Sequence, residues 1–400
     1  SAASDVYKRQ RQRQLNRYVL MKVKIGVTFR TDNRGKAHSD YDCVAINSIN
    51  LIKNDKGEPL FPFTVEAVTL PKGVSGSETP IHDASWTDLD GIDMLYIPGG
   101  PFANDTQVAT SEESSTDHLK EKDFNRVNPS PTKASDIRKH KEHQFRTQFE
   151  LKMIGYARQR GIPILAVCAG SWRLLEAYGG KVRTMELNER AVHHNPKNPW
   201  SISHAVKLLG GKMLTQLMHK KGVSPSDLAK VNSTHWAVAV TRDHLLESRD
   251  SGTTEASRHL EISAVCQDTK TVEAFESLYG TPVLGIQWHP ESYLPTMPGL
   301  PDTPTDEAYQ TAMKSQAIFS FMVWAAYVRQ RGVQSVADEV RKEHAAYQHL
   351  KTAKGLYTNK DFDNGRTVIK QAEMTLSPDT WTPRMKRLRQ ELLKLEKSPN

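Results

Sequence analysis

Three side chains of this 400-residue sequence could together form a nucleophilic centre: a thiol, an imidazole and a carboxylate. The thiol is Cys168, in the segment 166–170 (AVCAG) between an apolar run and a helical pattern. Small residues beside a nucleophile permit the sharp strand-to-helix turn that projects its side chain. Such a turn places the Ala169 N–H and the helix N-terminus beside the sulfur, where they favour the thiolate and can stabilise an oxyanion.

The imidazole and the carboxylate follow a second apolar run, Val283–Trp288, which ends in His289-Pro-Glu291. Side chains at i and i+2 lie on the same face of a strand. We therefore expect Glu291 to hold one ring nitrogen of His289 while the other faces Cys168, which is the arrangement of a Cys-His-Glu triad.

A third segment, Ile97-Pro98-Gly99-Gly100, also ends an apolar strand. Glycines let the backbone approach a ligand closely, and their N–H groups can supply a second oxyanion donor.

The elements that must position these residues alternate along the chain, short apolar runs with longer amphipathic ones. This pattern predicts an α/β fold of parallel strands joined by helices. The expected strands are 22–28, 63–70, 93–97, 164–168 and 283–288, and the expected helices are 41–51, 145–160 and 171–178.

In their order, these segments resemble the class I glutamine amidotransferase superfamily, and within it the C26 peptidases of the γ-glutamyl-γ-aminobutyrate hydrolase type. The resemblance covers roughly residues 22–330. It includes the PGG strand 93–100, the turn at Cys168, the segment 231–235 (VNSTH) and the closing GIQWHPES, 285–292. Four sequence positions depart from the family: Ala166 and Ala169 stand in place of Gly and Arg, and Trp236-Ala237 in place of His and Gln.

The resemblance implies a flavodoxin-like three-layer sandwich with a mostly parallel sheet. It also implies a nucleophilic Cys168, a general base and acid at His289, an orienting Glu291, and oxyanion or substrate contacts from Gly99, Gly100, Ala169, Ser233 and His235. For His235 a structural role is an equal alternative. The reaction would pass through a γ-glutamyl thioester that water hydrolyses, with no metal or organic cofactor. The pair His193-His194 has no partners at ligand spacing, and we interpret it as solvated.

Three stretches lie outside this predicted domain core. Residues 1–20 read as a non-native leader before the hydrolase domain, 21–330. Residues 104–144 are polar and predict a disordered surface insertion, with a lid over the site as the alternative. Residues 331–400 predict a basic extension with helices at 333–350 and 383–397, either a solvated pair packed on the domain or a docking element for a protein partner or a second copy.

The net charge of +8 belongs to the two ends, which argues against a nucleic-acid partner. Residues 1–20 hold five basic residues and one acidic residue, and residues 331–400 hold fourteen and nine, so that residues 21–330 are close to neutral. The longest apolar run, 318–328, is too short to span a membrane. Three cysteines without close spacing predict no disulfide framework and favour a reducing, cytoplasmic location.

These observations favour a cysteine-dependent hydrolase that releases glutamate from small γ-glutamyl amides. Two alternatives stay open. One is the glutaminase component of an amidotransferase whose synthase is a separate chain. The other is a non-catalytic binding or scaffold protein that has kept the same fold.

Overall fold

The computed structural model describes residues 21–30, 39–54, 56–72, 83–100, 134–193, 202–219, 228–233, 235, 237–249, 254–295 and 306–397. The chain divides into two compact units, 1–327 and 328–400. Within the described residues, none of the helices combines the length and the apolar character that a membrane crossing requires.

The first unit is built on a nine-stranded sheet in the order β2-β1-β3-β4-β13-β12-β11-β6-β7. Its parallel half consists of β1 (Lys22–Thr28), β2 (Thr64–Leu70), β3 (Met94–Ile97), β4 (Ile164–Val167) and β13 (Val283–Ile286). Its antiparallel half consists of β12 (Val272–Ser277), β11 (Leu260–Cys266), β6 (Ile202–Leu208) and β7 (Leu228–Asn232). The predicted α/β class with a mostly parallel sheet is confirmed.

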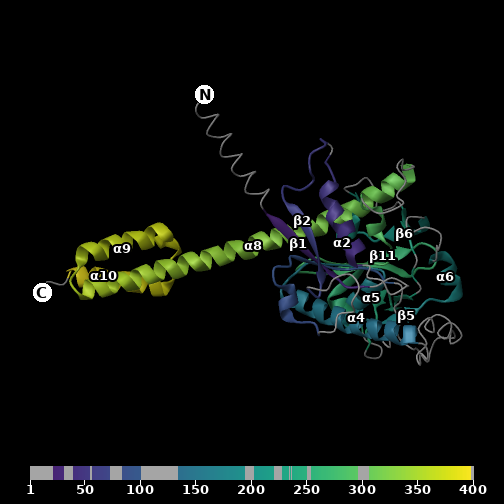
Figure 1. Cartoon of the computed structure of the whole chain (residues 1–400), viewed down its shortest axis with the longest axis horizontal. Coiled ribbons are helices and arrows are strands. Elements are labelled where there is room, and N and C mark those ends of the chain that lie inside the picture. The colour runs from purple at the N-terminus through teal and green to yellow at the C-terminus, as the bar shows by residue number, and fades with distance from the viewer. Residues whose placement is uncertain are drawn as a thin grey trace. The chain divides into compact units, whose positions relative to one another are not determined.

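Helices cover both faces of this sheet, and the alternation of side chains along each strand decides which residues meet which layer. In β3, Met94 and Tyr96 belong to one core cluster while Leu95 and Ile97 belong to the other. The first cluster packs against α2 (Ser39–Asn47) and residues 318–327 of α8 (Asp306–Thr358). The second packs against α4 (Ala134–Gln159) and α5 (Ala169–Ala177), which lie together beneath the sheet in Figure 1. The predicted three-layer sandwich is confirmed.

The described residues of the first unit also form shorter elements. They are the helices α6 (Leu187–His193) and α7 (Met213–His219), the strands β5 (Val182–Thr184), β8 (Ala237–Ala239), β9 (Thr241–Arg242) and β10 (Leu245–Leu246), and the 3₁₀ turns η1 (Ser48–Leu51), η2 (Trp86–Leu89), η5 (Glu255–Arg258) and η6 (Pro290–Tyr293). Strand β5 pairs with β8, and β9 with β10.

The register of the parallel strands brings three loops to one edge of the sheet. Ile97 in β3 lies opposite Ala166 in β4, and Ala166 lies opposite Gly285 in β13. Because the three strands run in the same direction, their carboxyl ends meet, and in open α/β sheets this is the edge where ligands bind. The chain leaves these ends at Pro98, Cys168 and Gln287, close to every residue of the predicted triad.

The expected disordered insertion, 104–144, is wrong for its last part. Helix α4 begins at Ala134, so residues 134–144 are helical. These residues include five Lys, Arg or His and few apolar residues. Apolar periodicity therefore did not predict that they are helical. Residues 104–133, and with them the alternative of a lid, lie outside the described residues.

The second unit contains both expected helices, 333–350 within α8 and 383–397 as α10, but it also has an apolar core that a solvated pair would lack. It contains the end of α8, then α9 (Phe362–Thr375), the 3₁₀ turn η7 (Pro378–Thr380) and α10 (Pro383–Lys397). Its buried residues are Ala346, Leu350, Ala353, Tyr357, Ile369, Ala372, Trp381, Met385, Leu388 and Leu392. Helix α9, which the sequence interpretation missed, carries Gly365 where a β-carbon would lie 2.2 Å from the Tyr357 ring.

Candidate active site

Cys168 occupies a strained turn between β4 and α5. Its backbone has φ 50° and ψ −115°, and its N–H donates to the Ile286 carbonyl at 2.7 Å. A left-handed conformation at a residue other than glycine costs about 1–3 kcal/mol and is typical of functional sites. Gly170 is required here because a β-carbon at that position would lie 2.3 Å from the Ile97 carbonyl oxygen.

His289 lies between Cys168 and Glu291. Its Nδ1 is 2.7 Å from Glu291 Oε1, and the ring also hydrogen-bonds Cys168. Burial lowers the pKa of His289, but the charges of Glu291 and Cys168 and both hydrogen bonds outweigh it and raise this pKa to about 10. The imidazole is therefore held as its cation at neutral pH.

The contact between His289 and Glu291 forms by a different geometry from the one predicted. Strand β13 ends at Ile286, and Glu291 belongs to the 3₁₀ turn η6, with Pro290 in its first turn. The turn, rather than the shared face of a strand, directs the carboxylate back to the imidazole. The pairing was expected correctly for a wrong reason.

The Pro98-Gly99-Gly100 segment packs directly on these two side chains. A β-carbon on Gly99 would lie 2.8 Å from His289 Cε1 and 3.1 Å from Cys168 Cβ. A β-carbon on Gly100 would lie 2.2 Å from Arg146 Nη1. Both glycines are therefore required for close approach. Ala169 is the first residue of α5, so its N–H is among those without an intrahelical acceptor.

Arg146 in α4 hydrogen-bonds the Pro98-Gly99-Gly100 segment. The sequence analysis did not predict this residue as part of the site. Its Nη2 donates to the carbonyls of Pro98 at 2.7 Å and Gly99 at 3.3 Å, while Nε donates to Glu150 Oε1 at 2.8 Å. The same oxygen accepts from Thr28 Oγ1 at 2.7 Å, at the end of β1. One buried ion pair thus joins α4, β1 and the glycine segment.

Removing only one partner of this pair should destabilise the fold. We expect Arg146→Met to lower the free energy of unfolding by about 3–5 kcal/mol, because it leaves the Glu150 carboxylate buried and uncompensated. Urea unfolding measures this. Arg146→Met combined with Glu150→Gln should recover part of the loss, and Lys22→Gln, in an exposed pair with Glu66, should change little. A double variant as unstable as the sum of both single variants would contradict the coupling.

Asn232 fixes the backbone of His289 and was also missed. Its Nδ2 donates to the His289 carbonyl at 3.0 Å, and its Oδ1 accepts from the His289 N–H at 3.3 Å. A second charged pair lies near the centre: Arg30 binds Asp42 through two hydrogen bonds of 2.6 and 2.7 Å. The charge of Glu291 acts on Arg30 and helps to raise its pKa, against the effect of burial.

Ser233 and His235 lie away from any accessible surface. Both are buried, and Ser233 Oγ is 2.5 Å from His235 Nδ1. The other nitrogen, Nε2, faces Glu273 Oε1 at 3.7 Å. This geometry favours the structural role of His235 over the alternative of a substrate contact. Trp236 lies outside the described residues.

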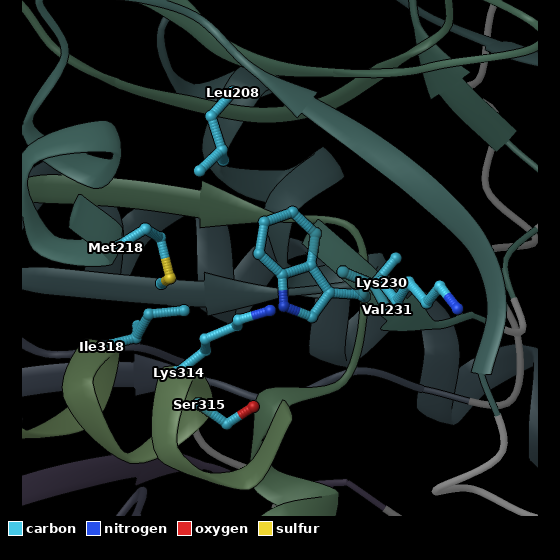
Figure 2. A pocket seen from close by; sticks show the side chains of 8 residues that line it. Leu208, Met218, Lys230, Val231, Lys314, Ser315 and Ile318 are labelled. Carbon is cyan, nitrogen blue, oxygen red and sulfur yellow. The ribbon is translucent and has the colours of Figure 1, made fainter. Parts of the chain in front are cut away.

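A small pocket is lined in part by Trp288, the residue before His289. It has a volume of about 10 Å³, which is room for about one water molecule. Figure 2 shows its lining, which includes Met218 of α7 and Ile318 of α8 together with Leu208, Lys230, Val231, Lys314 and Ser315. This pocket is too small to be the binding site of a γ-glutamyl compound.

Comparisons with known proteins agree with the predicted resemblance. The family model of Peptidase C26 matches residues 123–291. A Schizosaccharomyces pombe protein named as a glutamine amidotransferase is 27% identical over 238 residues, which are 58% of this chain and 81% of that protein. The resemblance to the C26 peptidases and the class I glutamine amidotransferases is confirmed.

Solved structures also match the chain at low sequence identity. The glutaminase domain of Trypanosoma brucei CTPS is 15% identical with a TM-score of 0.41, over 76% of this chain and 94% of that one. A glutamine amidotransferase of Thermotoga maritima is 12% identical with a TM-score of 0.34, over 94% of this chain and 99% of that one.

Proposed function

We propose that this chain, whose residues 123–291 match the C26 peptidase model, is a cysteine-dependent hydrolase that releases glutamate from γ-glutamyl amides. The observation that carries the proposal is the strained turn at Cys168 beside a His289 that Glu291 holds at 2.7 Å. The strained turn, the His289–Glu291 pair and Gly99, which has no room for a side chain, all lie beside the sulfur.

The first half of the reaction forms a thioester. The reacting form pairs a thiolate with a protonated imidazole, because cysteine attacks as its thiolate and the raised pKa of His289 keeps the ring protonated. Sγ of Cys168 attacks the γ-carbonyl carbon, and the N–H groups of Ala169 and Gly100 receive the developing oxyanion. His289 then gives its proton to the leaving amine as the C–N bond breaks.

The second half returns the enzyme to its starting state. His289, now neutral, removes a proton from water, and the resulting hydroxide attacks the thioester carbonyl. The C–S bond breaks, glutamate leaves, and the proton on His289 is again paired with the thiolate. Glu291 accepts a hydrogen bond from Nδ1 throughout, so it holds the ring in one orientation and stabilises the imidazolium.

A glutaminase that supplies a separate synthase is the second candidate. The name of the Schizosaccharomyces pombe relative favours it, because amidotransferases take the amide nitrogen of glutamine. Both candidates use the same thioester chemistry and differ only in the amine that leaves and in the need for a partner.

The test is the release of free glutamate, measured by mass spectrometry. The full chain is incubated with glutamine, γ-glutamyl-γ-aminobutyrate, γ-glutamyl polyamines and γ-glutamyl peptides. Release from an amide other than glutamine supports the stand-alone hydrolase, and the preferred amide identifies the substrate class. Weak release from glutamine alone supports the partner-dependent glutaminase. Silence across the panel would overturn the stand-alone hydrolase.

The pH dependence of kcat/KM should reveal the charge of His289. The leaving amine needs the proton of His289, so activity should persist above the usual imidazole pKa of 6.5 and fall as the pH rises through about 10. Glu291→Gln removes a carboxylate that raises this pKa, so the alkaline fall should move to lower pH. Glu66→Gln, at a half-exposed carboxylate in β2, is the matched control. If kcat/KM of Glu291→Gln falls at the same alkaline pH as that of the wild type, the assignment of this pKa to His289 is contradicted.

A further inference from the structure

A second group of chemically active side chains lies in the antiparallel half of the sheet. We call it the Glu273 cluster: His193 at the end of α6, His204 in β6, Cys266 at the end of β11, and Glu273 in β12. One donor atom from each lies within 4.8 Å of the others, and all four residues are buried. The expectation that His193 is solvated is wrong, since its exposed fraction is 0%.

The inner atoms of this cluster are the ring nitrogens that face Glu273 and the two carboxylate oxygens of Glu273. They lie close together, but within the described part of the chain they do not form regular hydrogen bonds. His193 Nδ1 lies 3.1 Å from Glu273 Oε1, and His204 Nε2 lies 3.2 Å from the same oxygen. Among the described residues, neither nitrogen has a hydrogen-bond partner of acceptable geometry, and neither Glu273 oxygen has one. Buried polar atoms normally have partners, because an unsatisfied one costs about 1–3 kcal/mol.

The outer nitrogens, by contrast, are held by hydroxyl groups. His193 Nε2 is 2.8 Å from Thr269 Oγ1, and His204 Nδ1 is 2.8 Å from Ser203 Oγ. When an outer N–H donates to a hydroxyl, the inner nitrogen carries a lone pair. Metal-binding histidines have this arrangement, in which a partner on one nitrogen fixes the tautomer and the other nitrogen binds the ion.

A network of hydrogen bonds does not account for the inner atoms. His235 Nε2 faces the same carboxylate at 3.7 Å, so three imidazoles surround Glu273. If all are neutral and their outer N–H groups donate to the hydroxyls, lone pairs face a carboxylate. If all are protonated, like charges lie on rings whose centroids are 4.3, 4.7 and 6.3 Å apart. One central cation satisfies the lone pairs and the carboxylate together.

We propose that His193, His204, Cys266 and Glu273 bind one divalent transition-metal ion, with zinc the best fit, as a structural site. Zinc takes four ligands in a tetrahedron, and bonds of about 2.1 Å place neighbouring ligand atoms about 3.4 Å apart. The two nitrogen–oxygen distances of 3.1 and 3.2 Å are close to that value. A thiolate with two imidazoles selects zinc-like ions over magnesium and calcium, which take oxygen ligands.

Cys266 supplies the fourth ligand atom of the site, a buried sulfur. A metal ion binds cysteine as the thiolate, so the ion would displace the thiol proton. The ion would join α6, β6, β11 and β12. Strand β12 is also linked to the chain that leads to His289, because the Gln287 N–H donates to the Glu273 carbonyl at 2.8 Å.

The test measures metal on the full chain and does not depend on hydrolysis. The protein is produced with zinc in the medium and dialysed, and its metal content is determined by plasma mass spectrometry. We expect about one zinc per chain. The protein is then exchanged with Co²⁺, which should give the visible bands of tetrahedral cobalt and a thiolate-to-cobalt charge-transfer band.

Two variants assign the ligands. Cys266→Ser should lose the charge-transfer band, and His204→Gln should weaken zinc binding at least about 10-fold, against a chelating indicator. Cys43→Ser, at a half-buried cysteine near Thr69, is the matched control and should keep both signals. Folded wild-type chain without stoichiometric metal overturns the proposal, and so does a charge-transfer band that survives in Cys266→Ser. If the variants fail to fold, the wild-type metal content and cobalt spectrum still decide.

Discussion

Replacing Cys168 by alanine is expected to lower the rate of glutamate release by about 10³-fold or more, while the chain stays folded. Sγ is the only atom removed, and in the proposed reaction it forms the bond to the γ-carbonyl carbon. The alanine keeps a β-carbon in the φ 50° turn, so the local strain is unchanged. Glutamate release is measured by mass spectrometry, and folding by circular dichroism and thermal unfolding.

A matched pair of variants separates the nucleophile from a general effect of cysteine loss. Cys43→Ser removes a half-buried thiol in α2 and should retain activity. Cys168→Ser keeps a nucleophilic atom but exchanges a thiolate for a weakly acidic hydroxyl, so it should be almost as inactive as the alanine. In the wild type, rapid quenching should reveal a mass increase of one glutamyl group, absent in Cys168→Ala. Full activity in Cys168→Ala would overturn the proposed mechanism.

The sequence predicts the strands and the reactive groups because both depend on neighbours along the chain. Strand β1 was expected at Lys22–Thr28 and has these bounds, since apolar runs between turn signals are local patterns. Cys168 and His289 follow such runs directly. The side chains come together because parallel strands end at one edge of the sheet, which is a general rule.

The supporting residues could not be predicted because their contacts join distant parts of the chain. Arg146 bonds the Pro98 carbonyl, 48 positions away, and Asn232 bonds the His289 backbone, 57 positions away. No local pattern distinguishes Arg146 from an ordinary basic residue on an amphipathic helix. The Glu273 cluster is even harder to predict from the sequence. Its metal-donor residues come from four elements between positions 193 and 273 and form no compact ligand motif.

Gly99→Ala is expected to lower kcat by about 10²-fold, the scale of a 1 Å misplacement at a reacting centre. The added methyl group would lie 2.8 Å from His289 Cε1 and 3.1 Å from Cys168 Cβ. Neither neighbour can yield freely, because Glu291 holds the ring at 2.7 Å and the backbone of Cys168 is bonded to Ile286. The methyl group must therefore separate the imidazole from the thiol or displace the glycine segment.

Gly155 in α4 offers the matched control, because a β-carbon there meets no atom within 4 Å. Gly155→Ala should leave kcat unchanged and stabilise the fold by about 0.5–1 kcal/mol, the difference between glycine and alanine inside a helix. Initial rates over a range of substrate concentrations, with urea unfolding of each variant, separate the two effects. A Gly99→Ala variant with wild-type kcat would show that the glycine segment does not press on His289 and Cys168 during the reaction. It would also remove the reason for assigning the Gly100 N–H to the oxyanion, because that donor is placed only by this close packing.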